Sequence, residues 1–527
     1  MPLLSATSGR GLAAMKCNLR EAWTRMIETM QRKVARPLAG AINSQSPAIF
    51  SAVDSMPKVR NAAVAGGFYP SDPKMLASTI DQMLAQVPQH KIDGKIVALV
   101  APHAGYVYSG PVAAHAYAAL ADRQYSRVVV IAPSHCEAFA HTSVYDGDAY
   151  ATPLGSISVD CTFVRRLAKC HPSIQLSGHG HRPTAEGAEH SLEVQLPWLQ
   201  RVLGDFQLVP IVMGEHSYES SRALGVALAG MIEDGKTLIV ASSDLSHYHS
   251  YDEAVELDHK TLDAMGNWDY FSMARNFQAR IWEACGGAPI VAAMIASERL
   301  GATQAEVLKY ANSGDTSGSR ARVVGYGAGV FVKTPHGQEA EMPFVLQEED
   351  KAELLSLAHA SVECAVRENR AYQPAPTASP SLNQERGAFV TLHKAGQLRG
   401  CIGYTSVRKP LFQTVRDTAA LAALRDPRFA PVTAAELSAL DFEISVLSPL
   451  HHLLDPERIE VGRHGLLIKR GVHEGLLLPQ VPVEQGWDRE TFLAHTCQKA
   501  GLPADSWKDQ DTDIFSFTAE VFADHKP

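Results

Sequence analysis

The chain has 527 residues, of which 46% are hydrophobic and 20% are charged, and its formal net charge is −9. This length suggests roughly two to four domains, and the composition excludes an intrinsically disordered chain. An acidic chain has no overall basic field to attract nucleic acid, and no apolar run approaches the ~18 residues that cross a bilayer. We therefore expect a globular protein that neither binds nucleic acid nor spans a membrane.

Residues 1–55 form a basic leader with an amphipathic stretch around 19–34. They lack the apolar segment and the small-residue cleavage site of a secretory signal. A transit peptide is an alternative, but Glu21 and Glu28 are atypical of one. Because Met56 directly precedes ordered-looking sequence, we expect a flexible extension or the product of a misassigned start codon.

Residues 56–333 alternate strand-like and helical patterns, as expected of a first domain. Strands are expected at 96–101, 127–132, 207–213, 237–242 and 323–332, and helices at 112–120, 190–202, 220–232 and 289–300. Strands separated by helices predict an α/β fold with helices on both faces of the sheet.

Three of these predicted strands end at potential metal ligands. His103 follows the first strand, His135 follows the second, and Asp244 and His247 follow the strand at 237–242. The carboxyl ends of strands form the ligand-binding edge of an open α/β sheet. Neutral imidazoles with an anionic ligand suit iron, copper or zinc, although each histidine alone could equally be a cap or a core residue. The sequence predicts a metal site at this edge.

Other candidate site residues lie near predicted helix starts. Cys285 precedes the helix expected from 289, where a helix amino terminus would favour its thiolate; the alternative is a small buried residue. Glu189 and His190 open another helix and are either capping residues or substrate contacts.

Residues 334–349 break the alternating pattern and are expected to be a linker. An amphipathic helix at 350–367 and strands at 387–393, 441–447 and 464–469 then predict a smaller α+β domain over 350–527.

Within this domain, Arg399 and Cys401 flank Gly400 in a predicted turn, where the backbone could approach a ligand closely. Arg399 could hold a phosphate or carboxylate, and Cys401 could be a nucleophile if its pKa were lowered. A tight turn with a packed cysteine and a structural arginine is the alternative.

The first domain resembles the Memo family. The resemblance rests on Gly-Gly-Phe-Tyr-Pro at 66–70, Ala-Pro-His-Ala-Gly-Tyr at 101–106, Pro-Ser-His at 133–135, Glu-His-Ser at 189–191, Ser-Ser-Asp at 242–244 and Cys-Gly at 285–286. It implies an α/β fold with a mixed sheet flanked by helices, like that of class III extradiol dioxygenases, which are non-haem iron enzymes.

The resemblance also implies roles for individual residues. It implies His103, His135 and Cys285 as metal ligands, and His247 as an acid/base group with Asp244 beside it. We expect Tyr106, Glu189 and His190 to contact substrate. Those dioxygenases use two histidines and a carboxylate, whereas a thiolate here favours copper or a differently tuned iron, so ring cleavage does not follow.

The second domain resembles the AMMECR family. Leu-Arg-Gly-Cys-Ile-Gly at 398–403 is the family hallmark, and Asp-Pro-Arg-Phe at 426–429 also matches. The resemblance implies the fold more than a function.

The joined domains resemble an arrangement in which both families accompany a radical S-adenosylmethionine enzyme, which implies such a partner. The chain has no C-x-x-x-C-x-x-C motif, so radical chemistry would come from that partner. Sparse cysteines without a C-x-x-C pair indicate a reducing cytoplasm.

Our first hypothesis is a redox enzyme or subunit that uses iron or copper on a small aromatic substrate. Its expected catalytic residues are His247, Asp244, Cys401 and Arg399. A metal-binding or docking scaffold and a zinc-dependent hydrolase are the alternatives.

Overall fold

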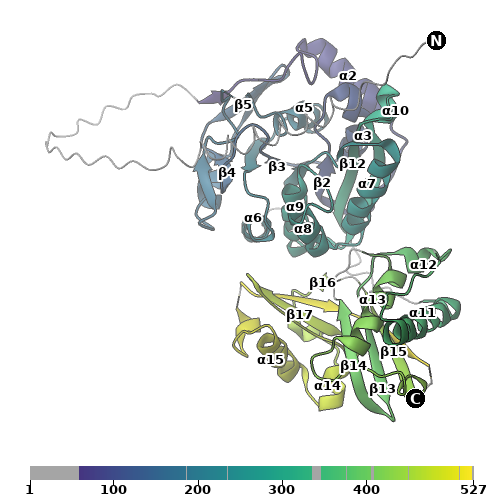
Figure 1. Ribbon diagram of the computed structural model, residues 1–527. Coiled ribbons are helices and arrows are strands. Elements are labelled where there is room, and N and C mark those ends of the chain that lie inside the picture. The colour runs from purple at the N-terminus through teal and green to yellow at the C-terminus, as the bar shows by residue number, and fades with distance from the viewer. Residues whose placement is uncertain are drawn as a thin grey trace, which may run out of the picture. The chain divides into compact units, whose positions relative to one another are not determined.

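The computed structural model (Figure 1) describes residues 58–334 and 346–524, apart from 186, 234, 376, 405–408, 449 and 510. The predicted extension at 1–55 and most of the predicted linker at 334–349 lie outside the described residues. Among the described residues, no helix combines the length and apolarity that a bilayer crossing needs. No disulfide bond joins two of the described cysteines.

The first α/β region is built on a mixed sheet of nine described strands in the order β10-β12-β2-β9-β3-β8-β4-β7, with β11 paired to β12. The central strands β2, β9, β3 and β8 run parallel, and β12 and β4 are antiparallel to their inner neighbours. The strands are β2 Lys95–Ala101, β3 Arg127–Pro133, β4 Thr142–Tyr145, β7 Ile174–Ser177, β8 Gln207–Met213, β9 Thr237–Ser242, β10 His247–His249, β11 Gln304–Asn312 and β12 Val323–Lys333.

The central strands are near-continuous apolar runs because helices cover them. All six residues of β9 are buried, and so are the last six of β2. Helix α9 (Gly287–Arg299) packs on β2, β3 and β9, and α3 (Tyr106–Ala118) packs on β2 and β12 (Figure 1). Burial on both faces leaves the carboxyl ends of the strands and the loops after them as the place for a site.

The remaining helices of this region are α2 Pro73–Ala85, α4 Cys161–Leu167, α5 Leu196–Leu203, α6 Tyr218–Met231, α7 Tyr251–Gly266, α8 Tyr270–Gln278 and α10 Ser313–Ser317. A small sheet adds β1 Val59–Arg60, β5 Ala149–Thr152 and β6 Gly155–Ser158.

Two predicted helices differ from those observed. Helix α3 begins at Tyr106 rather than at 112 and contains Pro111. The helix expected over 190–202 is instead a 3-10 turn, η1 (Glu193–Gln195), followed by α5. Pro197 lies in the first turn of α5, where its missing N–H costs no hydrogen bond, and this favours a helix start there.

The carboxyl-terminal region contains two antiparallel four-stranded sheets, β14-β13-β15-β20 and β16-β19-β17-β18, which confirms the α+β prediction. Its strands are β13 Ala388–Lys394, β14 Gln397–Tyr404, β15 Leu440–Leu447, β16 His451–His452, β17 Gly465–Arg470, β18 His473–Leu477, β19 Asp513–Phe517 and β20 Ala519–Ala523. Its helices are α11 Glu348–Glu368, α12 Pro380–Asn383, α13 Leu411–Leu424, α14 Gln480–Gln485 and α15 Arg489–Lys499.

The predicted turn around Gly400 is wrong. Gly400 lies inside β14, and a Cβ atom there would come 2.2 Å from the carbonyl oxygen of Ala422 on α13. The glycine therefore allows a helix, not a ligand, to approach the strand closely.

Candidate metal centre

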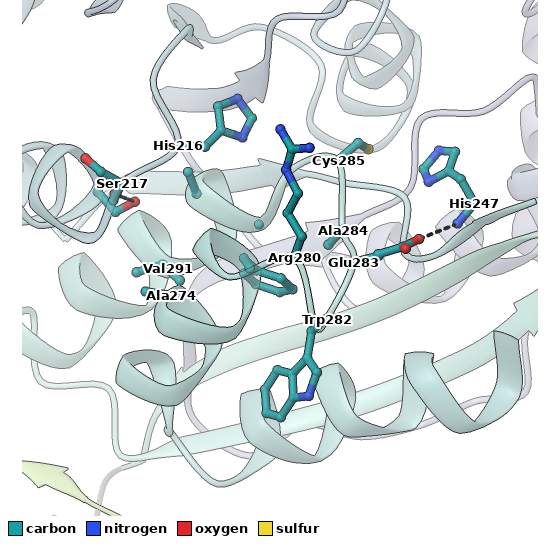
Figure 2. A pocket seen from close by; sticks show the side chains of 14 residues that line it. His216, Ser217, His247, Ala274, Arg280, Trp282, Glu283, Ala284, Cys285 and Val291 are labelled. Carbon is teal, nitrogen blue, oxygen red and sulfur yellow. Dashed lines mark hydrogen bonds between the residues drawn. The ribbon is translucent and has the colours of Figure 1, made fainter. Parts of the chain in front are cut away.

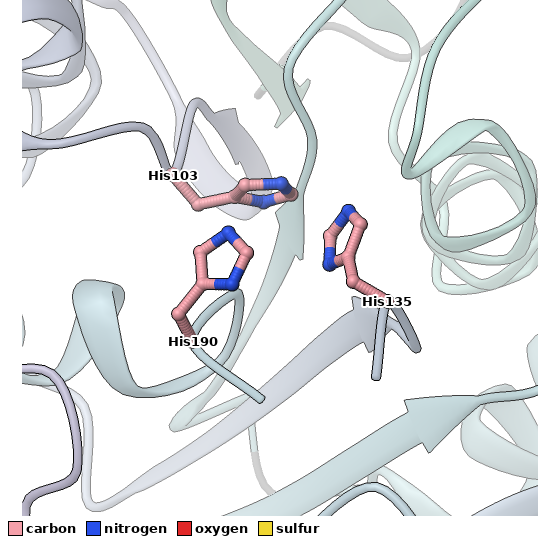
Figure 3. Close-up of side chains that lie close together, drawn as sticks. All are labelled: His103, His135 and His190. Atoms are coloured by element: carbon pink, nitrogen blue, oxygen red, sulfur yellow. The ribbon is translucent and has the colours of Figure 1, made fainter. Parts of the chain in front are cut away.

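Three histidines from separate loops meet beside the carboxyl edge of the sheet (Figure 3). His103 follows β2, His135 follows β3, and His190 precedes η1. One ring nitrogen from each lies within 4.8 Å of the others. The structure thus brings His103 and His135 together as the strand topology predicts, and it adds His190, which was expected to be a capping residue or a substrate contact and not a metal ligand.

Cys285 joins this cluster through His103. Its Sγ lies 3.1 Å from His103 Nε2, and the backbone N–H of Asp244 points to the same sulfur at 3.2 Å. Gly286 makes this position possible, because a Cβ atom there would lie 2.2 Å from the carbonyl oxygen of Ser242. The end of β9 and the start of α9 therefore hold the thiol against His103.

The hydrogen bonds of Ser242 determine which nitrogen of His103 carries the proton. The Ser242 hydroxyl donates to the carbonyl oxygen of Ser191 at 2.6 Å, which uses its only proton. Its oxygen therefore accepts from His103 Nδ1, 2.9 Å away, and from the Gln195 amide at 2.7 Å. This leaves a lone pair on His103 Nε2, the atom beside Cys285, which is the arrangement that a metal ligand requires.

Glu189 does the same for His135. Its carboxylate accepts from His135 Nδ1 at 2.9 Å and also accepts the backbone N–H of His135. It further accepts the backbone N–H groups of His190 and Ser191, each at 3.0 Å. Burial of Glu189 opposes ionisation, but these hydrogen bonds outweigh it and hold the pKa of the carboxyl well below its usual range. Glu189 thus orients His135 from behind rather than facing a substrate.

Electrostatics favour the neutral form of two of these imidazoles, those of His103 and His190. Burial, followed by the neighbouring His135, lowers the pKa of His103 well below its ordinary value, and the same two causes lower the pKa of His190 to about 4. Neutral imidazoles with free lone pairs are the form that binds metal ions. The donor set of three imidazoles and one thiol therefore fits a transition metal such as iron, copper or zinc.

The expected thiolate-favouring effect on Cys285 is wrong in this setting. Burial, followed by the nearby Asp244 carboxyl, raises the pKa of the Cys285 thiol well above its ordinary value. Desolvation therefore exceeds any contribution from the start of α9, and this sulfur would ionise on binding a metal ion.

Asp244 supports the loop that carries His103. It is buried, and its carboxylate accepts the backbone N–H groups of His103 at 2.8 Å and Ala104 at 3.3 Å. Burial raises its pKa to about 6. These contacts give Asp244 a positioning role beside the cluster.

His247 and Cys285 line a cavity of about 360 Å³ next to the cluster (Figure 2). The other lining residues come mainly from α6, α8, α9 and the loop after α8: His216, Ser217, Ser221, Ala274, Phe277, Arg280, Trp282, Glu283, Ala284, Gly287, Ala288 and Val291. Burial lowers the pKa of His247, which favours a neutral imidazole that can accept a proton. A small molecule in this cavity would therefore touch a base beside the cluster.

The structure does not favour a substrate contact for Tyr106. Its side chain is 2% exposed, packs on Tyr69 and Trp198, and donates its hydroxyl to the carbonyl oxygen of Val194. It belongs to the core because α3 begins at this residue and turns it inward.

Arg399 and Cys401, the candidate catalytic residues of the carboxyl-terminal region, hydrogen-bond to other residues of that region. Arg399 donates to Glu436 through Nε at 3.0 Å and Nη2 at 3.2 Å, and to the carbonyl oxygen of Ala430. The backbone N–H of Cys401 donates to Asp426, and the Thr391 hydroxyl points to its sulfur at 3.3 Å. These contacts favour the structural alternative for both residues.

Comparison with known proteins agrees with this architecture. The sequence model described as Memo-like protein matches residues 60–330. This chain belongs to the Memo family. A second model, described as AMMECR1, matches residues 355–522, so an AMMECR1 segment follows the Memo segment. The predicted family membership and fold class are thereby confirmed.

The individual relatives match different shares of this chain. A MEMO1 family protein of Methanopyrus kandleri is 37% identical over 284 residues, which are 52% of this chain and 98% of the relative. A protein of Thermococcus kodakarensis is 46% identical over 185 residues, 33% of this chain and 90% of the relative. The crystal structure of an uncharacterized Pyrococcus horikoshii protein is 41% identical, covers 35% of this chain and 96% of that one, and has a TM-score of 0.34.

Sequence reasoning missed His190 as a candidate ligand in this Memo centre. The available signal was the Glu-His pair at 189–190: Glu189 accepts from the ring of His135 and from the backbone N–H of His190, which places His190 next to His135. The role of His190 becomes clear only in the tertiary structure, where the loop that carries it lies at the sheet edge beside His103 and His135.

Proposed function

We propose that this Memo protein is a metal-dependent redox enzyme, or the metal-binding subunit of one, that acts on a small aromatic substrate. The proposed metal is iron or copper, held by His103 and His135 with His190 or Cys285 completing the set. The observation that carries the proposal is a pair of buried hydrogen-bond acceptors, Ser242 and Glu189. Each accepts a hydrogen bond from the Nδ1–H of one histidine. Histidines that bind metal ions almost always donate their other ring N–H to such an acceptor.

A bound iron or copper ion would supply redox chemistry at this centre. The chain's own residues would do the rest. Glu189 and Asp244 hold the His135 and His103 loops in place, and the cavity beside Cys285 offers a space in which a small substrate could lie next to the centre. His247 would accept a proton from the substrate on its imidazole, because its lowered pKa keeps the ring neutral near pH 7.

A radical S-adenosylmethionine enzyme is the partner we propose, and this part rests on the resemblance of the two joined families alone. The AMMECR1 segment would then bind that partner or the substrate. Copurification of the full chain with such an enzyme, and its loss when the AMMECR1 segment is deleted, would support this assignment.

A zinc-dependent hydrolase is the second candidate function. The observation that favours it is the third imidazole, since three histidines are also a donor set that zinc uses in catalytic sites. Here the ion would polarise water, and activity would be insensitive to oxygen.

The test is the metal content of the full chain, purified without oxygen and measured by elemental analysis and electron paramagnetic resonance. We expect close to one iron or copper per chain in the wild type and little in His103→Ala and His135→Ala. Comparing His190→Ala with Cys285→Ser identifies the remaining ligand. His259→Ala is the matched control, because this exposed histidine hydrogen-bonds only within its own helix.

The outcomes separate the hypotheses. Zinc in place of iron or copper would move the proposal to hydrolysis. A folded wild type that takes up no metal would overturn both and leave a docking scaffold.

A further inference from the structure

Arg280 lines the cavity beside the candidate metal centre, is exposed, and makes no side-chain ion pair or hydrogen bond within the described residues. The other charged side chain of this cavity wall, that of Glu283, does have partners. It accepts hydrogen bonds from His249 Nε2 at 2.9 Å and from the backbone N–H of His247. Figure 2 shows the Arg280 side chain extending to the side of the cavity where His216 and Cys285 lie. An unpaired guanidinium therefore faces a space that a small molecule could fill.

The backbone holds Arg280 in a conformation that normally selects glycine. It follows α8 with a φ of +56°, and the N–H groups of Arg280 and Ile281 close the helix end on Phe277 and Asn276. Glycine is the residue that adopts this conformation without strain. An arginine in this strained conformation suggests a functional side chain. Here the end of α8 directs the Arg280 side chain along the cavity wall.

Part of the remaining cavity wall is complementary to an apolar body. Phe277, Trp282, Ala288 and Val291 provide aromatic and aliphatic wall, while Cys285 and His247 stand at the polar end near the cluster. Guanidinium groups bind carboxylates and phosphates through paired, charge-assisted hydrogen bonds. An apolar ring with one anionic substituent would place the ring on this wall and the anion on Arg280.

We propose that Arg280 selects anionic substrates, so that the small molecule acted on here carries a carboxylate or a phosphate on its apolar or aromatic body. This inference rests on the proposed function, because it names the substrate class of the same site. Arg280 is a specificity-determining residue in this assignment and takes no part in metal binding.

The test is calorimetric titration of the full chain, metal-loaded and metal-free, with benzoate, phenyl phosphate and the neutral analogue benzyl alcohol. We expect the wild type to bind at least one of the two anions about tenfold or more tightly than the alcohol. Arg280→Gln should abolish that preference, and Arg280→Lys should restore part of it. Arg165→Gln, which removes the same charge from an exposed position on α4, should preserve it.

The tighter of the two anions identifies the substituent as carboxylate or phosphate. Equal binding of charged and neutral probes, no binding of either anion, or a preference that survives in folded Arg280→Gln would overturn the inference. Metal content measured in the same samples keeps the two proposals apart: a loaded protein without anion preference overturns only this one, whereas a protein that cannot be loaded overturns the proposed function.

Discussion

At the scale of single residues, the histidine cluster depends on side chains outside it that orient its imidazole rings. His103 and His135 come from different loops, yet each has its Nδ1 proton accepted by a buried oxygen, from Ser242 and Glu189 respectively. Such partners fix ring orientation and raise the basicity of the other nitrogen. The properties of the histidine cluster therefore depend on Ser242 and Glu189 as well, and the residue types serine and glutamate alone do not predict this role.

We expect Glu189→Gln to weaken metal binding by about 10- to 100-fold, because a neutral amide holds the His135 ring less firmly in the required tautomer. Competition titration against a chelator of known affinity measures this. Glu137→Gln is the matched control: Glu137 also pairs with a histidine, His179, but outside the cluster. Equal affinities of wild type and Glu189→Gln would contradict the orienting role.

At the scale of elements, the junction between β9 and α9 positions the thiol. Gly286 N–H donates to the Ser243 hydroxyl at 2.9 Å, and its Cα lies against the backbone at the end of β9. Any side chain at 286 would separate helix from strand and carry Cys285 away from His103.

Gly286→Ala should therefore lower the free energy of unfolding by about 1–3 kcal/mol through overpacking, and it should reduce metal occupancy if Cys285 is a ligand. Urea denaturation with metal analysis measures both effects. Gly230→Ala on α6, where an added Cβ meets nothing within 4 Å, should instead be neutral or stabilise by up to about 1 kcal/mol. Similar stabilities for the two variants would refute the close-packing argument.

At the scale of the whole molecule, a buried carboxylate ties the AMMECR1 segment to the Memo segment within one compact unit of the described residues. Asp513 on β19 accepts from the Tyr218 hydroxyl at 2.8 Å and from Arg222 Nε at 2.6 Å, both on α6. His452 Nε2 lies 3.3 Å from the same carboxylate. Phe515 and Phe517 of the same strand belong to the apolar cluster of the Memo segment.

The two titrating partners give this contact a defined pH window. Burial opposes both charges, but the hydrogen bonds of His452 and Arg222 lower the pKa of Asp513, and those of Asp513 and Glu298 raise the pKa of His452. The Asp513 contribution is present above its unfolded pKa near ~3.9 and is lost as the pH falls through the folded value. The His452 contribution is present below its unfolded pKa near ~6.5 and is lost as the pH rises through the folded value.

We expect Asp513→Asn to lower the free energy of unfolding by about 3–5 kcal/mol at pH 5.5, because it removes the buried negative charge that His452 and Arg222 share. The difference from wild type should shrink toward pH 8.5 as His452 loses its proton. Calorimetric melting at both pH values measures this, with the exposed Asp93→Asn as control. A difference independent of pH would show that His452 is not charged in this contact.

By itself, the sequence predicted β2, β3, β8, β9 and β12 of the Memo sheet and the edge at which His103 and His135 meet, but not β4, β7, β10 or β11. This follows because apolar runs such as 237–242 can be buried on both faces only as central strands, and parallel strands present their carboxyl ends together. The local sequence pattern was therefore sufficient to predict β2, β3 and β9 and to predict that His103 and His135 lie close together.

Only the tertiary structure decided the remaining features. It moved Tyr106 into the core, placed Gly400 inside a strand against Ala422, and paired Arg399 with Glu436. It also brought His190 beside His103 and His135 and left the Arg280 side chain without an ion-pair or hydrogen-bond partner among the described residues. These outcomes depend on which distant backbone or charge comes within a few ångströms, and no local periodicity or residue type encodes that distance.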